Sequence, residues 1–269
     1  MGVPDFYSLS AYGGALCVSM IFAAAYERTH RRGYWIGSFL TTLFFCGFRF
    51  YVGNDYDGYF NYFQTICTYP DVSWYIVEPA YVALNLLFSF SPIGYFYVLF
   101  VSSAITFSIV YYLLAKQGAL KWGVFAIYTL GFLIIANDQV RQMIAVSIVF
   151  LALHYIDEKK PLNYLLLITL AATFHYSSAV CILLYPLKYI KTKKGLMIML
   201  LCIAFIIKLT GEVDSFIQGL FQYIYVLNES YAEQSTNDIY YSGVSFGFQL
   251  LFFLDNIYID SYFITIISV

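Results

Sequence analysis

The sequence predicts an all-α integral membrane protein with about 8–10 transmembrane helices and loops on the outer membrane face. Its 269 residues are 61% hydrophobic and only 11% are charged, whereas about a quarter of the residues in a soluble domain are charged. A helix that crosses a bilayer needs about 20 apolar residues, so this length permits that number of crossings. The composition excludes an ordinary soluble enzyme, and the net charge of −2 gives no indication of a nucleic-acid partner.

Apolar segments follow one another along almost the whole chain, and residues 1–269 are therefore predicted to form a single transmembrane domain. The first segment has no basic region before it and no small-residue cleavage site, so we expect it to be a retained span rather than a signal peptide. The expected spans, with approximate ends, are 7–26, 33–51, 94–114, 122–136, 141–156, 161–174, 176–187, 195–209 and 245–254.

Basic residues predict the orientation of these spans. Cytoplasmic loops carry an excess of Lys and Arg, and most of the 14 Lys and Arg residues fall in four connections. Segments 53–78 and 210–244 contain several carboxylates but no Lys or Arg, so we expect them to be outer loops. The residues assigned to the cytoplasmic side are Arg28, Arg31, Arg32, Lys116, Lys121, Lys159, Lys160, Lys188, Lys191, Lys193 and Lys194.

Two short apolar segments need a special interpretation under this topology. Segment 79–90 would make about 18 Å of helix and lies between Pro79 and Pro92, so we interpret it as a re-entrant or interfacial hairpin on the outer side. Segments 161–174 and 176–187 are also short. Merging them would place two lysine clusters on opposite faces, so we expect two helices that meet at a recessed outer turn around His175.

Ionisable residues from separate parts of the chain collect on the predicted outer face. Such residues near membrane depth are costly and usually face a cavity or a partner. Two arginines can hold phosphate oxygens, and a carboxylate or imidazole can accept a proton from a hydroxyl. Each arginine could instead pair with a nearby Asp or extend to lipid headgroups. The residues concerned are Arg49, Asp55, Glu78, Asp138, Arg141 and His175, with Lys208 as a third outward cation or a helix anchor.

Aromatic residues are dense in segment 53–78, where they could form an interfacial belt or stack on sugar rings. The cysteines show neither CxxC nor zinc spacing and no pair placed for a disulfide. The calcium-loop pattern fails after Asp57, because Phe60 and Ile66 stand where Gly and Glu are needed. The sequence therefore predicts no metal and no cofactor.

Three ordered motifs resemble the EpsG family of Wzy-like exopolysaccharide polymerases. Residues 48–56 (FRFYVGNDY), followed by Tyr59, Tyr62 and Glu78 with Pro79, resemble the family's R…GxDY…Y pattern. Residues 137–145 (NDQVRQMIA) resemble its RQxxA helix start, and residues 174–179 (FHYSSA) resemble its FHxSA turn. The resemblance covers roughly residues 30 to 190. Family members usually continue for several more helices, so it also implies a truncated or frame-shifted member.

The resemblance implies a metal-independent membrane glycosyltransferase with a GT-C-like, O-antigen-ligase-like fold. It would polymerise polyprenyl-pyrophosphate-linked oligosaccharide repeat units on the outer face of the bacterial inner membrane, in contact with membrane lipid and other polysaccharide assembly and export proteins. Arg49 and Arg141 would hold the pyrophosphate, His175 or Asp55 would be the base, and Glu78 would orient a sugar or an arginine. The expected substrate-binding residues are Tyr56, Tyr59, Tyr62, Asp138, Gln142 and Lys208.

Other functions remain open at the level of the sequence. A transporter or flippase for lipid-linked sugars also needs cations along an aqueous path, but transporters place them near the bilayer midplane with repeat symmetry. A related O-antigen ligase would use the same residues on another acceptor. A non-catalytic scaffold of an export complex would not need the outer arginines or His175.

Overall fold

The computed structural model describes residues 6–50, 52–70 and 77–188. The chain clusters into two compact units, Met1–Lys191 and Thr192–Val269, and the description below concerns the first. The predicted spans 195–209 and 245–254, the predicted loop 210–244 and Lys208 lie outside the described residues. The organisation of residues 1–269 as a single domain therefore stays a prediction.

Every regular element in the described residues is a helix, which confirms the all-α class for this part of the chain. The elements are α1 (Phe6–Thr29), α2 (Arg32–Gly47), α3 (Tyr56–Thr68), α5 (Pro79–Phe88), α6 (Gly94–Lys116), α7 (Leu120–Thr129), α8 (Phe132–Asp138), α9 (Val140–Asp157), α10 (Pro161–Phe174), the 3₁₀ helix η1 (Tyr176–Leu183) and α11 (Leu184–Leu187).

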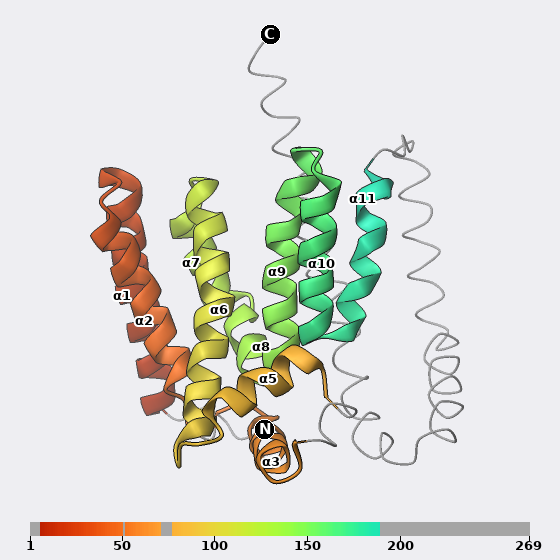
Figure 1. The fold of residues 1–269 in the computed structure, drawn as a ribbon. Coiled ribbons are helices and arrows are strands. Elements are labelled where there is room, and N and C mark those ends of the chain that lie inside the picture. Colours follow the sequence, from red (N-terminus) through yellow and green to blue (C-terminus); the bar gives the residue numbers. More distant parts are fainter. Residues whose placement is uncertain (1–5, 51, 71–76, 189–269) are drawn as a thin grey trace, which may run out of the picture. The chain divides into compact units, whose positions relative to one another are not determined.

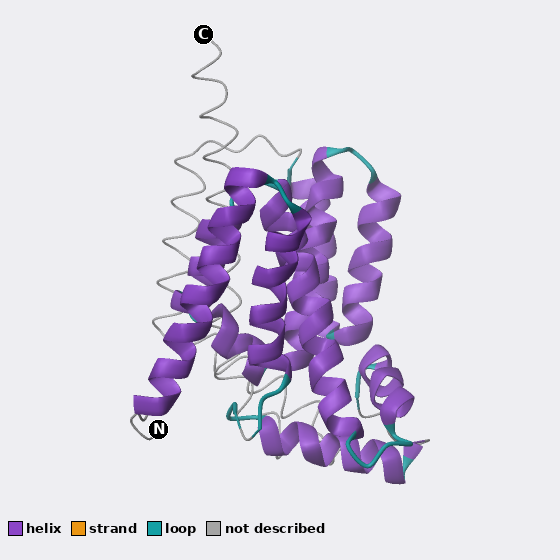
Figure 2. Cartoon of the chain, turned by 90° about the vertical axis from the view of Figure 1, so that its left-hand side faces the viewer, coloured by secondary structure: helices purple, strands orange, loops and turns teal. Residues whose placement is uncertain are grey.

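The long helices of this unit run up and down beside one another, and the short helices α3 and α5 lie across one end of them (Figure 1). We call this end the α3–α5 end. The same arrangement is visible from the side in Figure 2. Helix α1 packs against α2 and α7, α2 against α6, α6 against α9, and α9 against α10. The α3–α5 end is therefore where α2 and α10 end and where α6 and α9 begin.

The predicted basic turns lie at the opposite end, which we call the basic end. It contains the turns between α1 and α2, α6 and α7, and α9 and α10. There the Glu27 carboxylate accepts a hydrogen bond from the backbone of Lys121 (2.8 Å), and Lys116 Nζ lies 2.5 Å from His154 Nε2. The fold therefore separates the basic turns from the α3–α5 end, as the predicted topology requires.

A buried polar network joins α1, α2 and α6. The Ser19 hydroxyl lies 3.0 Å from those of Ser38 and Tyr111 and 3.1 Å from that of Thr42. Small hydroxyl residues let helices approach closely and hydrogen-bond across their interface, which is a common way for helices to associate in lipid. This network fixes the position of α2, and hence of Arg49 just beyond its end.

Two described helices, α6 and α9, are long and apolar enough to cross a membrane, and the bent pair α7 and α8 is a third candidate span. The predicted span at 122–136 corresponds to this pair, and the segment bends by 60° between α7 and α8. The break lies at Gly131, whose φ of 82° is a left-handed conformation that glycine adopts without steric cost. The total of 8–10 spans stays a prediction.

Two further segments differ from the sequence prediction. The expected outer loop 53–78 contains helix α3, whose buried residues Tyr56, Tyr59, Phe63 and Ile66 recur at helical spacing. The expected helix at 176–187 begins with the 3₁₀ turns of η1. The hydroxyl and the backbone N–H of Ser178 both donate to the His175 carbonyl, at 2.8 and 3.0 Å, which favours this tighter winding.

Candidate active site

A buried carboxylate joins two of the predicted site residues at the α3–α5 end. Glu78 precedes α5 and is 6% exposed. Its Oε2 atom accepts a hydrogen bond from the Arg141 guanidinium, and its Oε1 atom lies 3.1 Å from Nδ1 of His175. Residues from the starts of α5 and α9 and from the turn after α10 therefore meet at one carboxylate.

Local structure holds each member of this trio in place. Pro79 is the first residue of α5, a position at which its missing N–H costs nothing, so the helix starts directly after Glu78. Arg141 lies in the first turn of α9. His175 is extended (φ −156°, ψ 112°) between α10 and η1, and its Nδ1 atom contacts Glu78. The predicted break between two helices at His175 is present, and its recessed position on the outer face stays a prediction.

Three tyrosine rings surround the Arg141 guanidinium. Its central carbon lies 5.7 Å from the ring centre of Tyr59, 5.1 Å from that of Tyr62 and 5.9 Å from that of Tyr81. These contacts are within the range of cation–π attraction. The Nε atom of Arg141 is buried without a hydrogen-bond partner, so the guanidinium keeps unused donor capacity beside its bond to Glu78.

Arg49 lies just beyond the end of α2 and is 4% exposed. Its guanidinium donates to Oδ1 of Asn137 (2.5 Å), and its Nε is also buried without a partner. Asn137 is neutral, and no ion pair joins Arg49 to a carboxylate in the described part of the chain. Tyr59 and Tyr81 interact electrostatically with Arg49 as well as with Arg141. The buried guanidinium of Arg49 and the partly buried guanidinium of Arg141 thus share a tyrosine-lined environment.

Asp138 anchors the segment that follows Arg49. Its carboxylate accepts hydrogen bonds from the backbone N–H (2.8 Å) and side-chain amide (3.3 Å) of Asn54. Gly53 has φ of 109°, and a Cβ there would lie 2.8 Å from the Asp138 carboxylate. Only glycine fits this close approach with this backbone conformation. Asp138 therefore holds the loop after Arg49 against α8.

A model of the EpsG family matches residues 33–268. The chain belongs to the EpsG family. The match includes the candidate residues described above. It extends well beyond the segment of roughly residues 30 to 190 that the sequence motifs covered. No curated protein and no solved structure matches the chain. Membership of the EpsG family, together with the apolar helices, indicates an exopolysaccharide-associated, polymerase-like membrane protein.

The remaining predicted residues of this EpsG-family chain have different surroundings. Asp55 occupies the N-cap position of α3 without a side-chain capping bond. Tyr56 is buried and packs edge-on against Tyr95, whereas Tyr62 is half-buried beside Arg141. Gln142 is buried in the first turn of α9.

Two residues near the arginines were not among those predicted from the sequence. Asn137 was part of a quoted motif, but nothing in the motif indicated that it binds Arg49. Tyr81 is fully buried in α5, and its hydroxyl has no hydrogen-bond partner. Tyr81 follows Glu78 by three residues, which places the two side chains on one side of a helical turn. This spacing is the one sequence signal that could have indicated Tyr81 as a site residue.

The environment of Glu78 favours the ionised carboxylate. Burial raises the pKa of Glu78, but the hydrogen bond from His175 and the positive charge of Arg141 lower it by more, so the pKa lies below its ordinary value. Glu78 is therefore charged at neutral pH and accepts hydrogen bonds on both oxygens. Across residues 6–50, 52–70 and 77–188, no group of three His, Cys, Asp or Glu side chains could hold a metal ion, and the metal independence expected from the family stays a prediction.

Proposed function

We propose that this EpsG-family chain is a membrane glycosyltransferase that polymerises polyprenyl-pyrophosphate-linked oligosaccharide repeat units during exopolysaccharide or capsule biosynthesis. The observation that carries the proposal is the carboxylate of Glu78, which bonds Arg141 with one oxygen and His175 with the other. An anion-binding group and a proton acceptor are thereby held next to each other. Glycosyl transfer from a diphosphate requires both.

In the proposed reaction, a sugar hydroxyl of one repeat unit attacks the anomeric carbon of the sugar attached to the diphosphate of another. The new glycosidic bond forms as the bond between the anomeric carbon and the phosphate oxygen breaks. The electron pair of the broken bond leaves with the polyprenyl diphosphate. Arg49 and Arg141 would stabilise the charge that grows on this leaving group, using the guanidinium hydrogens that the fold leaves without partners.

His175 is the residue that we assign as the base. Glu78 is ionised, so it accepts a hydrogen bond from the Nδ1–H group of His175. The imidazole then presents the lone pair of its other nitrogen, Nε2, to a substrate. This is the arrangement in which a carboxylate orients a catalytic histidine. Asp55, the other candidate from the sequence, would instead contact a sugar hydroxyl. Tyr62 would contribute an aromatic surface for the glycan.

We further infer a polytopic protein of GT-C-like, O-antigen-ligase-like fold in the bacterial inner membrane. The concentration of Lys and Arg at the basic end supports a cytoplasmic location for that end. The α3–α5 end would then meet the outer face, where repeat units are joined. The polyprenyl tail would lie in a lateral groove among the helices, and other polysaccharide assembly and export proteins would be partners.

The proposal is tested with the purified full chain in lipid nanodiscs and a polyprenyl-diphosphate-linked repeat unit as the only added glycan. We expect a ladder of polymers and release of polyprenyl diphosphate, both lost in His175→Ala. Lys159→Gln, at the basic end, is the control variant and retains activity. Full polymerisation by His175→Ala would exclude this site. A parent chain that moves the lipid-linked unit between leaflets without lengthening it would favour a transporter.

A further inference from the structure

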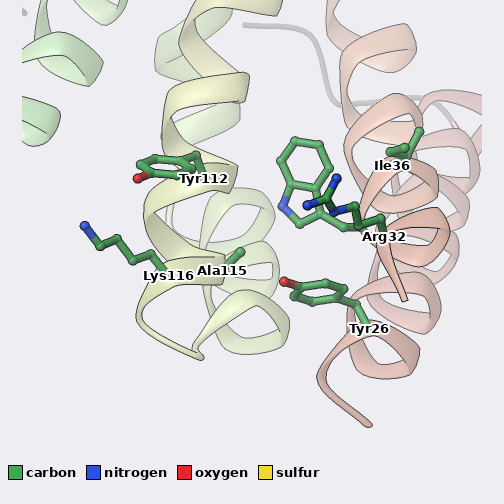
Figure 3. A pocket seen from close by; sticks show the side chains of 7 residues that line it. Tyr26, Arg32, Ile36, Tyr112, Ala115 and Lys116 are labelled. Atoms are coloured by element: carbon green, nitrogen blue, oxygen red, sulfur yellow. The ribbon is translucent and has the colours of Figure 1, made fainter. Parts of the chain in front are cut away.

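A pocket of about 500 Å³ opens at the basic end, between α6 on one side and α1 and α2 on the other (Figure 3). Tyr26 and Arg32 come from the α1–α2 side, and Tyr112 and Lys116 from α6. Arg32 is the first residue of α2 and Lys116 the last of α6, so the pocket lies at the opposite end of the helices from Glu78. It is separate from the proposed active site.

Two cations line this pocket, and neither forms an ion pair with a carboxylate in the described residues. Arg32 is exposed and forms no ion pair within the residues that the structure describes. Lys116 also forms none there, and its Nζ atom lies 2.5 Å from His154 Nε2. An ammonium group has three hydrogens, so at least two remain for a ligand. The pocket therefore has the charge to bind an anion.

The rest of the lining is aromatic and apolar. Tyr26, Trp35 and Tyr112 have rings with polar tips, which are typical of the membrane–water interface. Trp35 already donates its indole N–H to the carbonyl of Tyr111 (3.4 Å), so its ring is fixed in orientation. A ligand that fits this lining has an anionic group beside an apolar body.

An apolar stripe continues from the pocket along α2. Ile36, Leu40, Phe44 and Phe48 follow at four-residue intervals, which places them on one face of the helix. All four are exposed, at 46, 36, 49 and 65%. The stripe is about 18 Å long, close to the length of an extended phospholipid acyl chain. Phe44 and Phe48 stack with ring centres 5.4 Å apart, which forms a flat apolar surface at its far end.

We propose that this pocket binds the phosphate headgroup of an anionic phospholipid, with an acyl chain along the α2 stripe. Arg32 and Lys116 bind the phosphate, the three aromatic rings contact the glycerol region, and the stripe contacts the chain. The charge of the pocket and the length of the stripe together select a phospholipid rather than a free anion, because a free anion would gain nothing from the stripe.

The test uses the purified full chain in detergent, with native mass spectrometry to count bound phosphatidylglycerol and phosphatidylcholine. A cation near a membrane surface strengthens binding of an anionic lipid about fivefold. We expect Arg32→Gln and Lys116→Gln each to weaken phosphatidylglycerol binding about fivefold, and the double variant about 25-fold. Phosphatidylcholine binding should weaken much less, because its choline cation offsets the charge of its phosphate. Arg32→Lys, which keeps the charge, should retain the preference and guards against misfolding as the cause.

Arg31→Gln is the matched control, because Arg31 is the exposed neighbour of Arg32 and does not line the pocket. The proposal requires that this variant bind phosphatidylglycerol like the parent chain. An equal loss in Arg31→Gln, or no loss in the double variant, would overturn it in favour of general surface attraction. Competition by inorganic phosphate as strong as that by phosphatidylglycerol, or a preference for polyprenyl phosphate, would overturn it as well.

Discussion

Oε1 of Glu78 lies 3.1 Å from Nδ1 of His175, although 97 positions separate the two residues in the sequence. The other carboxylate oxygen of Glu78 binds Arg141. One side chain thus orients both the proposed base and one of the proposed phosphate-binding groups. Because Glu78 is almost completely buried, water cannot replace either bond easily.

Replacing Glu78 by Gln should slow the reaction. A glutamine presents an NH₂ donor in place of one carboxylate oxygen, so one of the two donors, Arg141 or His175, loses its acceptor. We expect kcat to fall by about 10²–10⁴-fold, as when the orienting carboxylate of a catalytic histidine is removed. Steady-state polymerisation by the purified chain measures this. Glu158→Gln, at the basic end, is the control, and a kcat for Glu78→Gln close to that of the parent would rule out the orienting role.

Replacing Asn137 by Asp should weaken binding of the lipid-linked substrate. The new carboxylate would stand within hydrogen-bond distance of the Arg49 guanidinium and neutralise its charge. We expect KM to rise about tenfold or more, with a smaller change in kcat. Asn163→Asp adds the same charge on an exposed part of α10 and should leave KM unchanged. Equal KM values for the two variants would argue against diphosphate binding by Arg49.

Gly53 and Gly58 should respond in opposite ways to substitution by alanine. At Gly53 the positive φ and the Asp138 carboxylate, 2.8 Å from a Cβ, should make Gly53→Ala destabilising by about 1–3 kcal/mol. Gly58 lies in α3 with nothing within 4 Å of a Cβ, so Gly58→Ala should stabilise by about 0.5–1 kcal/mol. Thermal unfolding of both variants tests this, and a similar Tm change in both would contradict the account of the loop.

The contribution of Glu78 to stability should depend on pH in one direction. Since the folded-state pKa of Glu78 is lowered, its ionised form stabilises the fold above the unfolded pKa of about 4.3, and this stabilisation is lost as pH falls through the folded pKa. The Tm difference between the parent and Glu78→Gln should therefore be large at neutral pH and shrink below about pH 4. A difference that does not change with pH would contradict ionisation of this carboxylate.

Much of the helical pattern could be predicted, because apolar segments bounded by Pro and by basic turns are strong signals in this sequence. The bend at Gly131 could not, since a single glycine within an apolar segment is compatible with a straight helix. Helix α3 was missed for a different reason. Its buried tyrosines also fit an interfacial aromatic belt in a loop. Only the packing of α3 against α5 distinguishes a packed helix from such a belt.

The charged residues of the candidate site could be found because charge is rare in this chain. Glu78, Arg141 and His175 stand out for that reason, but their pairing depends on how α5, α9 and α10 pack, which no local pattern contains. Tyr81 and Asn137 are uncharged, so in the sequence they resemble ordinary packing residues. Their proximity to the two arginines is visible only in the folded chain.

The most direct test of the central claim is the length of lipid-linked glycan in cells that lack the native gene. The cells are complemented with this chain or with Arg49→Ala, Arg141→Ala or His175→Ala, after each variant is shown to reach the membrane. We predict long polymer with the parent chain and single repeat units with each variant. Long polymer in all three variants would contradict the proposed site and favour a scaffold or transport role.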